Sequence, residues 1–150
     1  MYVVHFKRRS AILTLAGVML AAILALVLAG CFGGKEDEAV TLADDAARVA
    51  YLEELGWQTA SQPLETLDLQ LPEDLEEKWA DYTALQKQQG FPFADYGGQT
   101  VCRYTFRLTN YPGGRTDAQA NLLLCGSAVI AGDVMLLGAD GGQFSLAFPK

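Results

Sequence analysis

The side chains of this 150-residue chain that suit acid–base or metal chemistry are mainly carboxylates: it has 18 Asp and Glu residues, but three Cys and one His. His5 is the only histidine, and it precedes an apolar segment that we expect to be removed from the mature protein. Without an imidazole, the rest of the chain lacks the base of Ser/His/Asp and Cys/His catalytic sites and a frequent zinc ligand. Cys102 and Cys125 cannot supply a four-thiolate zinc site by themselves. We therefore expect no catalytic residue, no metal site and no cofactor.

Asp133 is the acidic residue whose position most needs an explanation. It interrupts the apolar segment 129–137, and counting back through a two-residue turn at Gly126 and Ser127 pairs it with Ala120. Ala120 lies on the expected apolar face of its strand, so this register buries the carboxylate. A buried carboxylate without partners costs several kcal/mol, and Asp133 therefore needs hydrogen-bond donors or a β-bulge.

Two interpretations of Asp133 follow from this conflict. In the structural one, a bulge, which the neighbouring Gly132 permits, lets the carboxylate accept backbone hydrogen bonds. In the functional one, a shifted register brings Asp133 near Arg103 or Arg107, and the recessed charge binds a cationic or polar ligand. Arg103, Arg107 and Asn121 occupy the polar face of their strands, so the candidate ligand or partner site is Asp133 with these three residues.

An enzymatic alternative uses carboxylates alone. A hydrolase of envelope glycans could combine Asp133 with a second acid such as Asp95 or Asp140. This chemistry requires two carboxyl groups roughly 5 to 9.5 Å apart on either side of a cleft. The separation of these side chains in the fold decides between this alternative and a binding module.

Cys102 and Cys125 are the thiols that could form a disulfide in an oxidising compartment. Side chains alternate between the two faces of a strand, so Cys102 is expected on the apolar face and Cys125 on the opposite face. A bulge would be needed to bring both thiols onto one face. The pattern favours two free thiols over a disulfide.

The third thiol, Cys31, stands at the end of an apolar segment that follows a basic cluster. Lys7, Arg8 and Arg9 precede an uncharged stretch from residue 10 to residue 34, which is the pattern of a secretion signal. Basic side chains resist crossing the bilayer, so the start of the chain stays in the cytoplasm. We therefore expect the remainder of the chain outside the cytoplasmic membrane.

Leu28, Ala29, Gly30 and Cys31 resemble the lipobox of bacterial lipoproteins, in which small residues admit the signal peptidase and the cysteine thiol is acylated. This resemblance implies that the protein is held at the cell membrane through lipid on Cys31. An uncleaved transmembrane helix is the alternative, because roughly 20 apolar residues are enough to span a bilayer. Both interpretations place the domain on the extracytoplasmic face.

The mature protein would be strongly acidic and small. Removal of residues 1–30 takes away three basic side chains and no acidic ones, which changes the formal net charge from −7 to about −10. A domain this acidic lacks the basic surface that binds nucleic acid, and it is better suited to cationic partners. Residues 31–40 combine glycines and charges without apolar periodicity and are expected to form a flexible tether, which leaves residues 41–150 as one domain.

The elements that must position these side chains are two helices and a sheet. Thr41 or Asp44 is expected to begin a helix that ends at Leu55, and Pro72 is expected in the first turn of a second helix that ends at Gly90. Alternating apolar and polar residues predict strands at 67–71, 102–109, 118–125, 128–137 and 144–148. The predicted fold is α+β, with two helices packed on one face of an antiparallel sheet and a C-terminal four-strand meander.

Six short segments are similar to one protein family in the same order and spacing. They are YLEELGW (51–57), LQKQQGF (85–91), RYTF (103–106), NYPG (110–113), ANLL (120–123) and GDV (132–134). The segments resemble domain-of-unknown-function family 4830, whose similar members are short, envelope-anchored proteins of Clostridia and relatives, which are Gram-positive. The resemblance covers roughly residues 44–142 and implies no activity or ligand. Where the family tends to have Gly, Met and His after its last turn, this chain has Gly142, Gln143 and Phe144.

Together these patterns predict an extracytoplasmic lipoprotein that acts as a binding or interaction module rather than as an enzyme. Its expected partners are the membrane, through Cys31, and an envelope protein or a small ligand. A carboxylate-dependent envelope hydrolase is the alternative function.

Overall fold

The computed structural model describes residues 39–149 of the chain. The predicted signal, the lipobox with Cys31 and most of the predicted tether lie outside the described residues. Within residues 39–149, none of the helices has both the length and the apolar character needed to cross a membrane.

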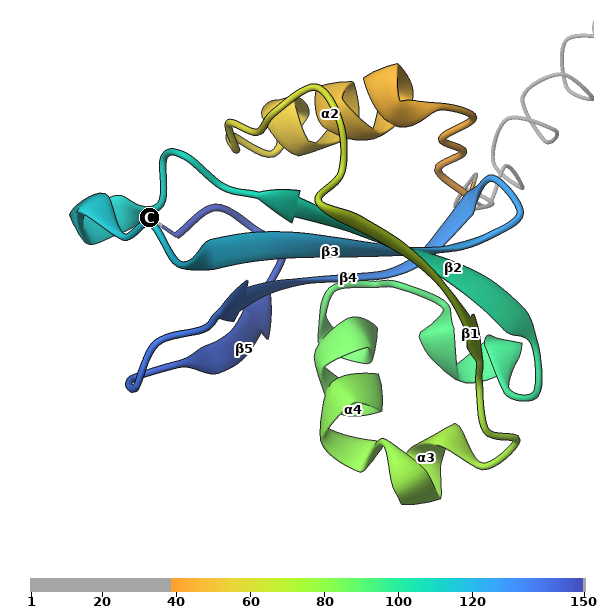
Figure 1. Cartoon of the computed structure of the whole chain (residues 1–150). Coiled ribbons are helices and arrows are strands. Elements are labelled where there is room, and N and C mark those ends of the chain that lie inside the picture. The colour runs from red at the N-terminus through yellow and green to blue at the C-terminus, as the bar shows by residue number, and fades with distance from the viewer. Residues whose placement is uncertain (1–38, 150) are drawn as a thin grey trace, which may run out of the picture. The chain divides into compact units, whose positions relative to one another are not determined.

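The described part of the chain forms an antiparallel sheet with helices (Figure 1). The strands are β1 (Glu65–Gln70), β2 (Thr100–Arg107), β3 (Ala118–Cys125), β4 (Ala128–Leu136) and β5 (Gly142–Ser145), and they lie side by side in sequence order. The helices are α2 (Asp45–Glu54), α3 (Leu75–Lys78) and α4 (Ala80–Gln88), with short 3-10 turns η1 (Phe93–Tyr96) and η2 (Pro112–Gly114). The α+β class and the C-terminal meander, β2 to β5, are therefore confirmed.

The helices cover both faces of the sheet, whereas the sequence predicted both on the same face. Figure 1 shows α2 on one side of the strands and α3 with α4 on the other. The first core, which contains Leu52 of α2, packs on the face that carries Phe106 and Leu122. The second core, which contains Leu75 of α3, packs on the face that carries Leu123. The central strands are apolar on both faces, so each face requires a cover.

The second predicted helix is broken into α3 and α4 at Trp79. The Trp79 backbone has φ −128° and ψ 42°, which is outside the helical region, although its carbonyl still accepts a hydrogen bond from the Thr83 N–H at 2.8 Å. The first helix begins as expected, because Asp44 accepts a hydrogen bond from the Ala47 N–H at 2.8 Å as its N-cap. The break places Trp79 beside Phe93, with the two rings stacked 6.0 Å apart.

The β3–β4 hairpin contains a bulge that changes the expected register. Its turn is of type II′, as predicted. Gly126 has φ 61°, and none of the described non-glycine residues has a positive φ. A type I′ turn would need a positive φ at Ser127 as well. Beyond the turn, Ile130 is an extra residue of β4, and the pairing shifts by one position. Asp133 therefore pairs with Asn121 and not with Ala120, as the unbulged count had given.

Cys102 and Cys125 are both free thiols in the structure. Cys102 lies on β2 opposite Leu124, which belongs to the first core, whereas Cys125 packs against the second core. The two thiols thus belong to opposite faces of the sheet, as the strand alternation predicted.

Candidate functional site

A pocket of about 240 Å³ lies between α4 and the sheet, on the face of the second core. Three of the four predicted site residues line it: Asp133 from β4, Asn121 from β3 and Arg103 from β2. Other elements supply four further lining residues, namely Tyr82 of α4, Trp79 of the α3–α4 junction, Gln143 of β5 and Leu69 of β1. The pocket is therefore built from segments that are distant in sequence.

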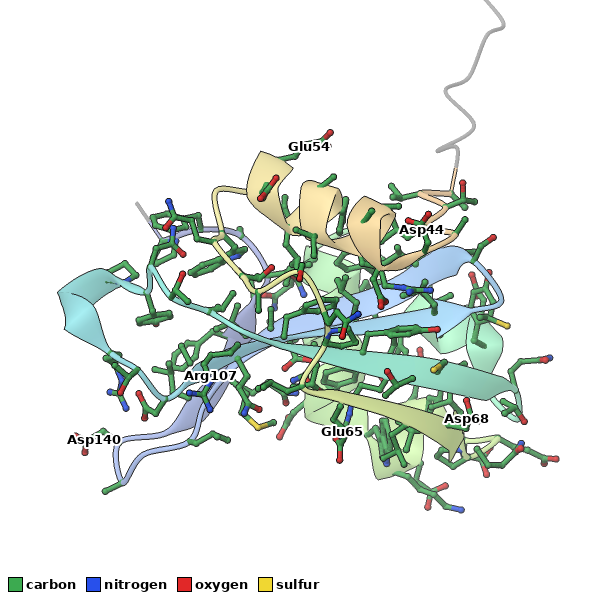
Figure 2. The ribbon with its side chains drawn as sticks, turned by 45° about the horizontal axis from the view of Figure 1, so that its top comes forward. Asp44, Glu54, Glu65, Asp68, Arg107 and Asp140 are labelled. Atoms are coloured by element: carbon green, nitrogen blue, oxygen red, sulfur yellow. The ribbon has the colours of Figure 1, made fainter. Side chains whose placement is uncertain are left out.

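Arg107, the fourth predicted residue, does not line this pocket. It is exposed near the end of β2, where it pairs with Gln119 (Figure 2). The alternation of β2 puts Arg107 on the same face as Arg103, but four residues along an extended strand correspond to roughly 13 Å. Thr105 lies opposite Asn121 and is therefore level with Asp133, midway along β2 between Arg103 and Arg107. Of the two arginines that the functional interpretation named, Arg103 lines the pocket with Asp133 and Arg107 does not.

Asp133 is held by side chains from neighbouring elements. Its carboxylate, with the residue only 2% exposed, accepts hydrogen bonds from the Tyr82 hydroxyl at 3.1 Å and from Asn121 Nδ2 at 3.0 Å. The Thr105 hydroxyl donates to Asn121 Oδ1 at 2.8 Å, which fixes the orientation of the amide. These partners differ from the backbone donors that the structural interpretation of Asp133 had expected.

Burial controls the protonation of this group more than any single neighbour does. Burial raises the pKa of Asp133 above its ordinary value, while hydrogen bonds with Asn121, Gln143 and Tyr82 and the charge of Arg103 lower the same pKa. The pKa of the Tyr82 phenol is raised, first by burial and then by the charge of Asp133, so this hydroxyl stays a donor. The pocket thus holds one carboxyl group whose ionised form is stabilised incompletely.

Arg103 is directed mainly to another acid. Its Nη2 forms an ion pair with Glu65 Oε2 of β1 at 2.6 Å, and its side chain is 32% exposed. Its Nε atom is buried and has no hydrogen-bond partner among the described residues. Arg103 therefore lines the pocket without neutralising Asp133 through direct contact.

The acids proposed for a two-carboxylate mechanism do not meet. Asp95 lines a separate hollow beside α3, and Asp140 lies in the exposed turn between β4 and β5 (Figure 2). Among the described residues that line the pocket, Asp133 is the only one with a carboxyl group. The predicted pairing of Asp133 with either acid is therefore wrong for this fold.

Two glutamines, which the sequence reasoning did not single out, hold α4 against the sheet. Gln86 Oε1 accepts from the Gly132 N–H at 3.0 Å, and Gln89 Nε2 donates to the Gly132 carbonyl at 2.9 Å. Gln89 Oε1 also accepts from the Leu146 N–H at 2.6 Å. We call these contacts the amide clamp. They take the place of β4–β5 pairing between Gly132 and Leu146, directly beyond the end of β5. They also position α4, and with it Tyr82, over Asp133.

The amide clamp also explains why Gly132 stands next to Asp133. A Cβ atom at this position would lie 2.7 Å from Leu146 Cδ2, so the buried Leu146 side chain would have to shift. LQKQQGF and GDV, two of the segments similar to family 4830, thus meet at this contact. Two glutamines three residues apart near the end of a predicted amphipathic helix are the sequence signal that could have indicated it.

Comparison with known proteins gives one family. The family model described as Domain of unknown function (DUF4830) matches residues 51–134. This range includes Tyr82, Arg103, Asn121 and Asp133 but ends before Gln143. No curated protein and no solved structure matches the chain.

Proposed function

The chain belongs to the DUF4830 family, whose description states no function. From its pocket we propose that the protein is a non-catalytic module that binds a small polar ligand. We further propose that it works on the extracytoplasmic face of the cell membrane, anchored by lipid on Cys31. The observation that carries the binding proposal is the almost fully buried Asp133 carboxylate at the wall of a pocket.

The arrangement of Asp133 supports a binding role because it is set in place before any ligand arrives. Tyr82 and Asn121 hold the carboxylate from two different elements, and Thr105 holds Asn121. Groups fixed in this way lose little conformational entropy when a ligand binds, which favours affinity. Polar groups converging in a mainly apolar pocket are typical of small-molecule sites.

The size of the pocket favours a small molecule over an envelope protein as the ligand. Its volume of about 240 Å³ is below the roughly 300 to 1,000 Å³ of pockets for drug-sized ligands. Hydrolysis is disfavoured as the alternative function, since the described residues lining the pocket provide one carboxyl group and the mechanism needs two.

The anchor is tested by metabolic labelling with palmitate in the native cells. The full-length protein is expected to take up the label and Cys31→Ser to lose it. Equal labelling of both proteins would refute acylation at Cys31, and retention of Cys31→Ser in the membrane fraction without label would indicate an uncleaved helix.

The binding role is tested by identifying what the protein carries. The full-length protein and Asp133→Asn are purified from the native cells, and the small molecules released by heat denaturation are compared by mass spectrometry. We expect a compound that accompanies the wild type and is lost from Asp133→Asn. Asp140→Asn, which changes an exposed acid in a turn, is the matched control and should retain it. Identical small molecules from all three proteins would refute a site at Asp133.

A further inference from the structure

We propose that the pocket binds a small zwitterion of the amino-acid class, with the ammonium group directed to Asp133 and the carboxylate to Arg103. This inference rests on the proposed binding function and names its ligand class. It follows from three features of the pocket: a carboxylate without a cation, an aromatic wall, and a guanidinium group with an unused donor.

The first feature is that the partners of Asp133 carry no charge. They are a phenol and an amide within hydrogen-bond distance, with the Gln143 amide also favouring the ionised form. None of the ion pairs among residues 39–149 includes Asp133. Neutral donors offset only part of the cost of burying a charge, whereas a cationic ligand group would provide a charge-assisted bond.

The second feature is the aromatic wall beside the carboxylate. Trp79 and Tyr82 both line the pocket, and their rings meet edge to face with centroids 6.0 Å apart. Phe93 packs against both rings, at 6.0 Å from Trp79 and 5.0 Å from Tyr82, and it is fully buried. Aromatic faces attract ammonium groups, and Phe93 packs against both rings of this wall. The wall and Asp133 therefore favour the same kind of ligand group.

The third feature is the donor capacity that remains on Arg103. A guanidinium group has five N–H donors, and among the described residues Arg103 donates a hydrogen bond from its Nη2 atom to Glu65. The Nε atom is buried without an acceptor in the described part of the chain. A ligand that brought only a positive charge would leave this donor unused and would face repulsion from Arg103. A carboxylate on the same ligand removes both disadvantages.

The apolar lining and the small volume of the pocket restrict the class of ligand further. Leu69, Leu123 and Met135 complete the wall around the charged groups, which suits an apolar ligand side chain. A metal ion is a poorer occupant, because the described residues contain no cluster of three His, Cys, Asp or Glu side chains. The pocket therefore fits an amino acid with an apolar side chain better than it fits a divalent cation.

The test is calorimetric titration of the full-length protein in detergent micelles. The probes are the twenty amino acids, together with isopentylamine and 4-methylpentanoate, which lack the carboxylate or the ammonium group of leucine. We expect at least one apolar amino acid to bind, and the two leucine analogues to bind about tenfold or more weakly than leucine itself. Asp133→Asn should abolish binding, and Arg103→Gln should reduce the preference for leucine over isopentylamine.

Other outcomes overturn the inference and are distinguishable from failure of the proposed function. Isopentylamine binding as tightly as leucine would show that the site recognises a cation alone. Binding of calcium chloride in place of every amino acid would identify a metal site. If no amino acid binds while a different small molecule still accompanies the protein and depends on Asp133, the ligand class is wrong and the binding function stands. If no amino acid binds and nothing accompanies the protein, both proposals fail.

Discussion

The amide clamp makes a quantitative prediction for Gln89→Met. Methionine has nearly the length and helix propensity of glutamine, so the substitution removes hydrogen bonds with little change in shape. Gln89 makes two bonds to backbone groups, at 2.9 Å to the Gly132 carbonyl and at 2.6 Å from the Leu146 N–H. Each is worth about 1 kcal/mol net, so we expect a loss of about 2 kcal/mol in the free energy of unfolding.

The assay is equilibrium unfolding in urea, followed by tryptophan fluorescence. Trp57 is a suitable reporter, because it is 1% exposed and its indole N–H donates to the Leu146 carbonyl at 2.7 Å, next to the clamp. A loss of this size lowers the melting temperature by about 8 °C in a domain of this length. The urea midpoint should fall without a change in the slope of the transition.

The matched control is Gln88→Met. Gln88 is the last residue of α4 and directly precedes Gln89, but its side chain is exposed and makes no hydrogen bond in the described structure. Its substitution should change the free energy of unfolding by less than about 0.5 kcal/mol. Equal unfolding midpoints for the two variants would refute the reasoning, because the clamp would then contribute no net stability.

Three further predictions concern the pocket and the hairpin. Tyr82→Phe removes one hydrogen bond to the Asp133 carboxylate, so it should lower the free energy of unfolding by about 1 to 2 kcal/mol at pH 7 in urea titrations; an unchanged value would contradict the bond. Because burial raises the folded-state pKa of Asp133 above its ordinary 3.8, the folded protein binds this proton more tightly than the unfolded chain, and stability declines as pH rises from about 4 through the folded pKa. Asp133→Asn should therefore gain stability relative to the wild type over that range, and parallel pH profiles would refute the shift. Gly126→Ala forces a side chain to adopt φ 61°, which should cost about 1 kcal/mol in urea unfolding and leave ligand binding unchanged; weakened binding would link the turn to the site.

The sequence predicted the elements whose cause is local. The alternation in β2 and β3, the Asp44 cap and the type II′ turn at Gly126 depend on neighbouring residues, and the structure contains all of them. The opposite faces of Cys102 and Cys125 follow from the same alternation. Each of these features is determined within one strand, one helix end or one turn.

The bulge at Ile130 could not be located by such local reasoning, although the conflict around Asp133 indicated that one was needed. A shift of one residue exchanges the two faces of a strand. In the observed register Val134 joins the first core, and Asp133 faces Asn121 and the pocket. That register lowers the cost of burying Asp133 only because Tyr82 and Asn121 supply donors on this face. Which register forms therefore depends on contacts with α4, whose Tyr82 is 51 residues from Asp133 in the sequence.

What the sequence by itself determined was the α+β class, the meander and the choice of Asp133, Arg103 and Asn121 as candidate site residues, because these follow from periodicity and from the cost of burying charge. The tertiary structure decided which side chains complete the pocket. Trp79, Tyr82 and Gln143 reach it only because α4 covers the second face of the sheet and β5 pairs with β4. Contacts between distant elements minimise the free energy of the whole domain, and no pattern within one segment encodes them.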